Sequence, residues 1–169
     1  SMARHANLRK RTLVTASFGK TFHVTGWKLG YIFGPQELMT EFRKVHQFNV
    51  FSCNHPMQNA IAEYISEEEN YLTLGSFYQK KRDLFNEAAS QSRFEIIQSS
   101  GTYFELLDYS KITDEKDTDF AIRMTKEFGL ASIPVSVFYN TPNEDKVLRF
   151  CFAKQEETIE KACEILVRI

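Results

Sequence analysis

Cysteine is scarce in this sequence, which contains only Cys53, Cys151 and Cys163, widely spaced and in no C-x-x-C pair. An odd number of cysteines without paired spacing argues against a disulfide framework and against a zinc site. Because Cys163 falls on an apolar helical stripe, we expect buried free thiols in a reducing environment. The cysteine usage therefore favours a cytoplasmic protein.

Long apolar runs, ligand-spaced histidines and a strong net charge are also absent. No run approaches the roughly 18 residues of a membrane-spanning helix, and the basic, polar N-terminal stretch lacks the apolar segment of a signal peptide. The four histidines show no ligand spacing, so we expect no metal site. A net charge of −1 argues against a dedicated nucleic-acid binder. We therefore expect no membrane, metal or nucleic-acid partner.

The sequence does contain enough apolar residues for a core, and its charge is unevenly distributed. The 169 residues are 43% hydrophobic, and a chain of this size typically buries about 70% of its unfolded surface. Residues 1–50 carry eight Lys or Arg against two acidic residues, a net charge of +6, whereas residues 51–169 carry −7. The basic segment predicts either a solvated face or a site for an anion such as phosphate.

The first part of the chain predicts two strands followed by helices. Residues 12–17 and 29–33 are typical of short buried strands, and the glycine-containing loop between them is too irregular for a helix. Pro35 suits the first turn of one helix, and the His-Pro pair at 55–56 opens another. A long helical stretch follows at about 71–90. Two strands alone do not form a stable sheet, so this part is expected to belong to a larger one.

From about residue 94 the order β-β-α-β-β-α predicts a compact α+β unit with a largely antiparallel sheet. Its predicted segments are strands at 94–98 and 102–108, a helix at 117–128 ended by Gly129, an extended piece at 130–134, a strand at 147–153 and a final helix. The last strand places Arg149 among apolar neighbours. The final helix carries an apolar stripe that includes Ile159, Cys163 and Leu166.

The loop between the first two strands, S-F-G-K-T-F-H-V-T-G-W-K-L-G-Y at residues 17–31, carries the most chemical information. Gly19-Lys20-Thr21 imitates the end of a phosphate-binding P-loop, but the first glycine of that motif would fall on Val14. Ser17-x-x-Lys20 imitates the serine and lysine of penicillin-binding enzymes, whose S-D-N and K-T-G motifs are missing. Neither interpretation is supported.

A third interpretation is a lysine that binds pyridoxal phosphate. This chemistry needs an amine that forms a Schiff base with the aldehyde, together with short polar donors and a cation for the phosphate. Ser17 lies three residues before Lys20 and Lys28 lies eight after it. A loop that ends a strand can bring both to one phosphate. An isolated lysine in such a loop would more often be a surface residue, so the full string of residues decides.

That string closely resembles the lysine segment of class I/II aminotransferases of fold type I, and it is most similar to the kynurenine and methionine aminotransferase subgroup. The resemblance continues in family order over residues 8–169, through F-R-K-V-H-Q-F-N-V-F, H-P-M-Q, G-T-Y-F, I-P-V-S-V-F-Y and L-R-F-C-F-A-K. It implies an α/β fold in which residues 1–70 are a C-terminal strip of the large cofactor-binding domain. Residues 71–93 would then be a linking helix, and residues 94–169 the small C-terminal domain.

The resemblance also implies the roles of single residues. Lys20 corresponds to the Schiff-base lysine, and Ser17 and Lys28 correspond to phosphate ligands, although many relatives have arginine at the position of Lys28. Arg149 corresponds to the arginine that binds the substrate α-carboxylate; from the residues alone, an ion pair at a strand edge is the other interpretation. Phe51 corresponds to an aromatic residue that reaches the neighbouring subunit's substrate pocket in a homodimer, with plain core packing as the alternative.

The implied reaction is pyridoxal-phosphate-dependent transfer of an amino group from methionine, an aromatic amino acid or kynurenine to a 2-oxo acid. A cysteine-S-conjugate β-lyase uses the same lysine, and a non-catalytic folded module also remains open. The family's aspartate for the pyridine nitrogen and part of its pocket precede the lysine, and this sequence begins 19 residues before Lys20. We therefore expect a C-terminal half that is inactive by itself.

Overall fold

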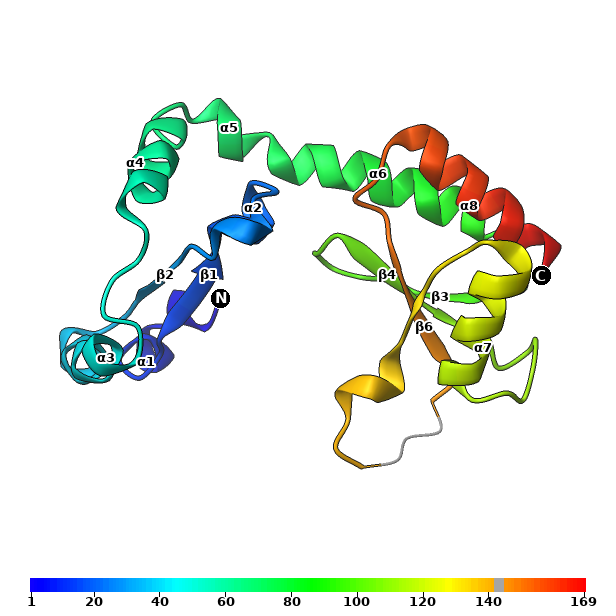
Figure 1. The fold of residues 1–169 in the computed structure, drawn as a ribbon, viewed down its shortest axis with the longest axis horizontal. Helices are drawn as coiled ribbons and strands as arrows, with labels where there is room; N and C mark the ends of the chain where they lie inside the picture. The colour runs from blue at the N-terminus through cyan, green and yellow to red at the C-terminus, as the bar shows by residue number, and fades with distance from the viewer. Residues whose placement is uncertain (142–144) are drawn as a thin grey trace. The chain divides into compact units, whose positions relative to one another are not determined.

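The computed structural model describes residues 1–141 and 145–169 and divides into two compact units, Ser1–Leu72 and Thr73–Ile169 (Figure 1). The assignment of the chain to a large-domain strip, a linking helix and a small domain stays a prediction. No helix of the described residues is both long enough and apolar enough to cross a lipid bilayer.

The first unit is built on one antiparallel strand pair. Its elements are η1 (Met2–Arg4), α1 (Ala6–Arg9), β1 (Val14–Ser17), α2 (Phe18–Thr21), η2 (Thr25–Trp27), β2 (Gly30–Phe33), α3 (Gln36–Asn49), α4 (His55–Tyr64) and α5 (Glu69–Leu72). β1 and β2 pair so that Val14 lies opposite Phe33 and Ser17 opposite Gly30. The two predicted strands are therefore confirmed. The segment between them, predicted to be irregular, instead contains the single helical turns α2 and η2.

Capping residues set the starts of the longer helices in this unit. Pro35 precedes α3, and the Asn54 side chain accepts a hydrogen bond of 3.1 Å from the amide of Met57 at the start of α4. The apolar faces of these helices are only partly covered, since Val45 of α3 is 68% exposed and Tyr64 of α4 is 47% exposed. The strands are not buried either, because Tyr31 and Phe33 of β2 remain about half exposed.

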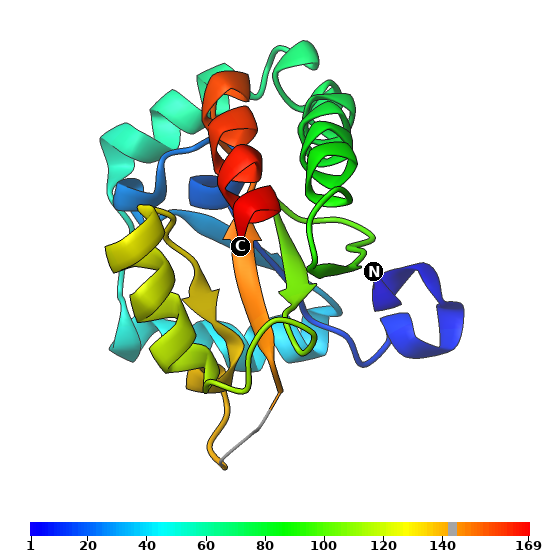
Figure 2. The ribbon, with the colours of Figure 1, turned by 90° about the vertical axis from the view of Figure 1, so that its right-hand side faces the viewer.

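The second unit packs helices on a four-stranded sheet. Its elements are α6 (Leu74–Ala89), β3 (Glu95–Ile97), β4 (Phe104–Asp108), α7 (Asp117–Arg123), the π-helical turn η3 (Met124–Phe128), β5 (Ile133–Pro134), η4 (Val135–Phe138), β6 (Val147–Cys151) and α8 (Glu156–Arg168). The sheet order is β3-β4-β6-β5 with every pair antiparallel, and Figure 2 shows β6 in orange in the middle. The predicted α+β order is confirmed, and Gly129 ends the α7–η3 helix with φ at +70°.

One face of this sheet carries the core of the second unit. Helices α6 and α8 pack side by side (Figure 1), and buried residues of both meet Leu107 of β4 and Leu148 and Phe150 of β6. Because side chains alternate along a strand, Arg149 and Cys151 project from the opposite face of β6. Burial supports this alternation, since Leu148 and Phe150 are buried whereas Arg149 and Cys151 are not.

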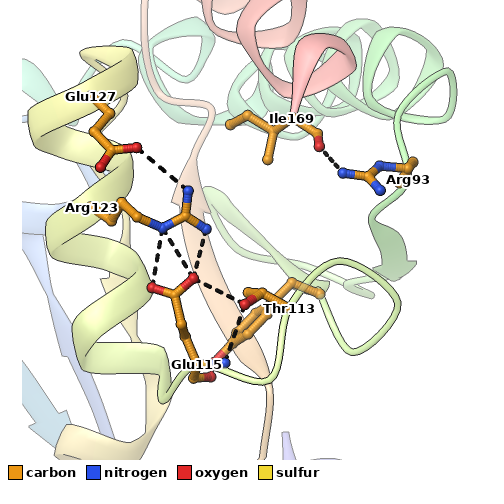
Figure 3. A network of polar contacts seen from close by, with 7 residues as sticks. Arg93, Thr113, Glu115, Arg123, Glu127 and Ile169 are labelled. Atoms are coloured by element: carbon orange, nitrogen blue, oxygen red, sulfur yellow. Dashed lines mark hydrogen bonds and ion pairs between the residues drawn. The ribbon is translucent and has the colours of Figure 1, made fainter.

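A polar network fixes α7 and the C-terminus on this core (Figure 3). The guanidinium of Arg123 donates to both carboxylate oxygens of Glu115, at 2.7–3.1 Å, and Glu127 lies 3.6 Å away on its other side. The Arg123 guanidinium holds the pKa of the Glu115 carboxyl below its ordinary value. Arg93 donates to the main-chain oxygen of Ile169, which ties the end of α8 to the strand region.

Two further predictions about this part of the chain need correction. The helix predicted at 71–90 is interrupted at Thr73, where α5 ends and α6 begins. Helix formation is weakened there by a β-branched residue and by Gly75 two positions later. The expectation of buried thiols is confirmed for Cys163 but is wrong for Cys151, which is exposed on the open face of β6.

Candidate active site

The loop around Lys20 is shaped by a close contact between β1 and β2. Ser17, the last residue of β1, lies opposite Gly30, the first residue of β2. A Cβ atom at Gly30 would lie only 2.5 Å from the carbonyl oxygen of Ala16, so a larger residue would force the strands apart. Lys28, two residues earlier, has left-handed backbone angles, with φ at 54° and ψ at 37°. This left-handed residue connects η2 to the start of β2.

Aromatic side chains anchor the same loop. The rings of Phe18 and Phe22, on either side of Lys20, stack with centroids 6.0 Å apart. Phe18 also packs against Tyr31 of β2 at 5.0 Å, and Phe22 meets the ring of Tyr64 in α4 edge-on at 5.2 Å. These contacts hold the α2 turn, and therefore the backbone of Lys20, at the end of the strand pair.

The loop lines a small, open polar pocket. It has a volume of about 310 Å³ and is lined by Ser17, Lys20, Thr25, Lys28, Leu29 and Gly30. Three residues predicted from the sequence, Ser17, Lys20 and Lys28, are therefore brought together on one cavity. Thr25 adds a second hydroxyl that the sequence analysis did not select, although its place between Lys20 and Lys28 in the same loop was a usable signal.

The lining of this pocket suits a phosphorylated carbonyl compound. It contains two amines and two hydroxyls, and none of the six lining residues is acidic. A phosphate dianion binds best to such charge-assisted and hydroxyl donors. One of the two amines can then bind phosphate while the other remains for the carbonyl carbon. Lys20 and Lys28 are two of the eight basic residues of residues 1–50, and the other six do not line this pocket.

Arg149 lies in the second unit, in β6, one of the two inner strands of its sheet. In the sheet register, Arg149 lies opposite Leu106 of β4 on one side and Ile133 of β5 on the other. Its guanidinium carbon lies over two aromatic rings, 4.8 Å from the centroid of Phe104 and 5.4 Å from that of Phe138. Over residues 1–141 and 145–169, the Arg149 guanidinium forms no ion pair with a carboxylate. The alternative of an ion pair at a strand edge is therefore wrong for these residues.

Phe51 follows α3 in the first unit. Its amide donates to the carbonyl of His46 at 3.0 Å, and its backbone is left-handed, with φ at 67°. At 79% exposure the side chain is not core packing within this chain, which removes the alternative considered for it. Its predicted role toward a second subunit is not tested by the single chain.

The mixed α/β fold and the lysine pocket identify the class of protein: the chain has the fold of the C-terminal part of a fold type I transferase. The family follows from its sequence. A family model described as aminotransferase class I and II matches residues 1–166, and the chain belongs to that family.

Relatives with assigned activities are aminotransferases. The chain is 46% identical to a methionine aminotransferase of Escherichia coli over 167 residues, covering 98% of this chain and 43% of that enzyme. It is 34% identical to human kynurenine–oxoglutarate transaminase 1, covering 98% of this chain and 44% of that enzyme.

The solved structures agree. The crystal structure of YbdL from Escherichia coli, for which a methionine aminotransferase function was identified, superposes with a TM-score of 0.94 at 45% identity. That comparison covers 100% of this chain and 45% of YbdL. N-Succinyldiaminopimelate aminotransferase from Mycobacterium tuberculosis gives a TM-score of 0.88 at 28% identity, covering 98% of this chain and 44% of that enzyme. This chain thus spans less than half the length of these relatives.

Proposed function

We propose that this chain carries the lysine site and the carboxylate site of a pyridoxal-phosphate-dependent aminotransferase. The observation that carries the proposal is the convergence of Ser17, Lys20 and Lys28 on one pocket of about 310 Å³ without an acidic lining residue. Membership of the aminotransferase family supports the same chemistry. The residues present fit the cofactor, since they offer an amine for its aldehyde and a cation and hydroxyls for its phosphate.

Each residue of the pocket then has a distinct task. Ser17 and Lys28 bind the phosphate, with Thr25 as a further hydroxyl, and Lys28 does so as a compact point charge rather than as a bidentate fork. Pyridoxal phosphate, when bound, supplies an aldehyde that captures the amino group and a ring that withdraws electrons from the substrate Cα. The Nζ of Lys20 would hold that aldehyde at rest, and once the substrate amine has displaced it, the freed amine would take up the Cα proton of the substrate.

Arg149 of the second unit is proposed to bind the substrate α-carboxylate. Its guanidinium presents N–H donors in a rigid plane that matches a carboxylate in bidentate fashion. Holding the carboxylate fixes which bond of Cα faces the proton acceptor. Phe51 is proposed to line the substrate pocket of a second subunit, in a cytoplasmic homodimer.

The proposed substrates follow from the relatives. Methionine aminotransferase and kynurenine–oxoglutarate transaminase are the relatives described above, so methionine, aromatic amino acids and kynurenine are proposed as amino donors and 2-oxo acids as acceptors. Product analysis with the whole protein distinguishes this reaction from β-elimination: a 2-oxo acid that keeps the donor's carbon skeleton indicates transamination, whereas pyruvate with ammonia from a cysteine S-conjugate indicates a lyase.

The proposal is tested by phosphate-dependent labelling of Lys20. The chain is incubated with pyridoxal phosphate or with pyridoxal, reduced with borohydride, and digested for mass spectrometry. We expect the phosphate to raise labelling of Lys20 about ten-fold, the equivalent of one charge-assisted contact. Ser17→Ala and Lys28→Gln should each reduce that preference. Arg11→Gln, which removes an exposed charge outside the pocket lining, is the matched control and should leave it unchanged.

Equal labelling of Lys20 by the two aldehydes would contradict the phosphate site. Turnover is a separate question, because this chain spans less than half the length of its aminotransferase relatives. We expect the 169-residue chain to show no turnover of methionine with a 2-oxo acid. Turnover by the unaltered chain that Lys20→Ala abolishes would overturn this expectation.

A further inference from the structure

The guanidinium of Arg149 is held by aromatic rings that come from both sides of its strand. Phe104 begins β4, which pairs with β6 on one side. Phe138 ends η4, which directly follows β5, the partner of β6 on the other side. The guanidinium carbon is 4.8 Å from the Phe104 centroid and 5.4 Å from the Phe138 centroid. Two separate neighbours of the strand thus converge on one cation.

The contact restrains the arginine without occupying its donors. A phenyl ring attracts a cation through the face of the ring, but it does not accept a conventional hydrogen bond from the N–H groups in the plane of the guanidinium. Arginine has five N–H donors, and none of them is engaged in an ion pair with a carboxylate of the described residues. A long side chain that is already confined loses less freedom when a ligand binds it.

We propose that Phe104 and Phe138 are positioning residues, which confine the Arg149 guanidinium so that its N–H donors are ready to bind a carboxylate. This inference rests on the proposed function, because that proposal gives Arg149 its ligand. It adds two residues that the sequence analysis did not select and gives each a physical task. Neither residue needs to touch the carboxylate to perform it.

Simple core packing does not account for the two rings. The core of this unit lies on the opposite face of the sheet, where Leu148 and Phe150 are buried. Phe138 is 64% exposed, so its ring contributes little to that core. Phe104 is the closer ring and is only partly exposed, and a cation–π contact strengthens when it is shielded from water. We therefore expect Phe104 to contribute more than Phe138.

The test measures carboxylate binding at Arg149 in the full 169-residue chain. Butanoate is titrated at constant ionic strength while the side-chain Nε–Hε resonances are followed by NMR, with butanamide as the uncharged control. Arg149→Lys assigns the Arg149 resonance, and Arg11 serves as an internal reference for weak surface binding. The variants are Phe104→Leu, Phe138→Leu, the double variant, and Phe104→Tyr, which retains a ring.

We expect a saturable shift of Arg149 with butanoate and none with butanamide. Phe104→Leu should raise the dissociation constant about three-fold and the double variant about ten-fold, while Phe104→Tyr should stay close to the unaltered chain. Unchanged backbone spectra of the core show that each variant is folded. Phe138→Leu should have a smaller effect than Phe104→Leu.

Two results overturn the inference in different ways. Equal affinity in the unaltered chain and in folded Phe104→Leu, or an equal loss in Phe104→Tyr, removes the positioning role and leaves the carboxylate assignment of Arg149 standing. No saturable shift in the unaltered chain removes both. Neither result bears on the phosphate-dependent labelling of Lys20, so the failure of this inference and the failure of the cofactor site are distinguishable.

Discussion

Asp117 is expected to be one of the most sensitive positions in the second unit. Its carboxylate is only 4% exposed and accepts three hydrogen bonds, from the Ser136 amide at 2.7 Å, the Ser136 hydroxyl at 2.6 Å and the Thr118 amide at 2.8 Å. It thereby ties the start of α7 to η4, the turn that carries Phe138. Hydrogen bonds to a charged group contribute about 1.5–3 kcal/mol each, and removal strands the buried donors.

The Asp117→Ala variant should lose about 3–5 kcal/mol of unfolding free energy, and Asp117→Asn, which keeps one acceptor oxygen, about 1–2 kcal/mol. Asp119→Ala is the matched control, because it removes an exposed acid from the same helical turn. Urea unfolding followed by circular dichroism measures the change, and hydrogen exchange of the Ser136 amide locates it. A loss no larger than that of Asp119→Ala, with Ser136 still protected, would refute the reasoning.

Three further predictions concern separate parts of the chain. Burial raises the pKa of the Cys163 thiol from 9.0 to about 11, so between these pH values the folded chain keeps a proton that the unfolded chain loses. The stabilising contribution of the protonated thiol is complete below pH 9 and should fall by about 2–3 kcal/mol as the pH rises through 11. Parallel curves of stability against pH for the unaltered chain and for Cys163→Ala would contradict this. Glu105 is fully buried, and its carboxylate accepts from the Ser99 amide and from the Asn86 side-chain NH2. Glu105→Gln replaces this carboxylate by a neutral amide and retains both contacts once the Asn86 amide turns over, so that the Asn86 oxygen accepts from Gln. Urea unfolding should therefore show a gain of about 1 kcal/mol, and a loss of similar size would refute it. Gly30→Ala should abolish the phosphate-dependent labelling of Lys20, because the added Cβ would clash with the Ala16 carbonyl. Gly26→Ala is the control and should retain the labelling, because a Cβ at Gly26 meets nothing within 4 Å. Equal effects of the two variants would contradict the close contact between the strands.

The sequence predicts the second unit better than the first. Its strands alternate, its last helix has a periodic stripe, and Gly129 ends a helix with the backbone angles that glycine favours. These signals are local, so they can be recognised without knowledge of tertiary contacts. In the first unit the local pattern predicts buried strands, yet Tyr31 and Phe33 of β2 stay about half exposed. Burial depends on what packs against a strand, and a local pattern does not specify that.

The candidate site divides in the same way. Ser17, Lys20 and Lys28 lie within twelve residues of one loop, and their roles were predicted from the resemblance of that loop to the lysine segment of class I/II aminotransferases. The contact of Phe138 with Arg149 depends on the pairing of β5 with β6, which no local pattern specifies. The turn at α2 was also missed, because it is stabilised by rings from β2 and α4 rather than by its own glycine-containing sequence.

The most direct test of the account is the position of the covalent label when the chain is reduced with borohydride in the presence of limiting pyridoxal phosphate. Peptide mapping counts the adduct on Lys20 against that on Lys28, which lines the same pocket, and on Lys10, which does not. Lys20 is expected to carry most of the label, and excess inorganic phosphate is expected to reduce it. Label spread over exposed lysines, or concentrated on Lys28, would contradict the assignment of Lys20 as the cofactor lysine.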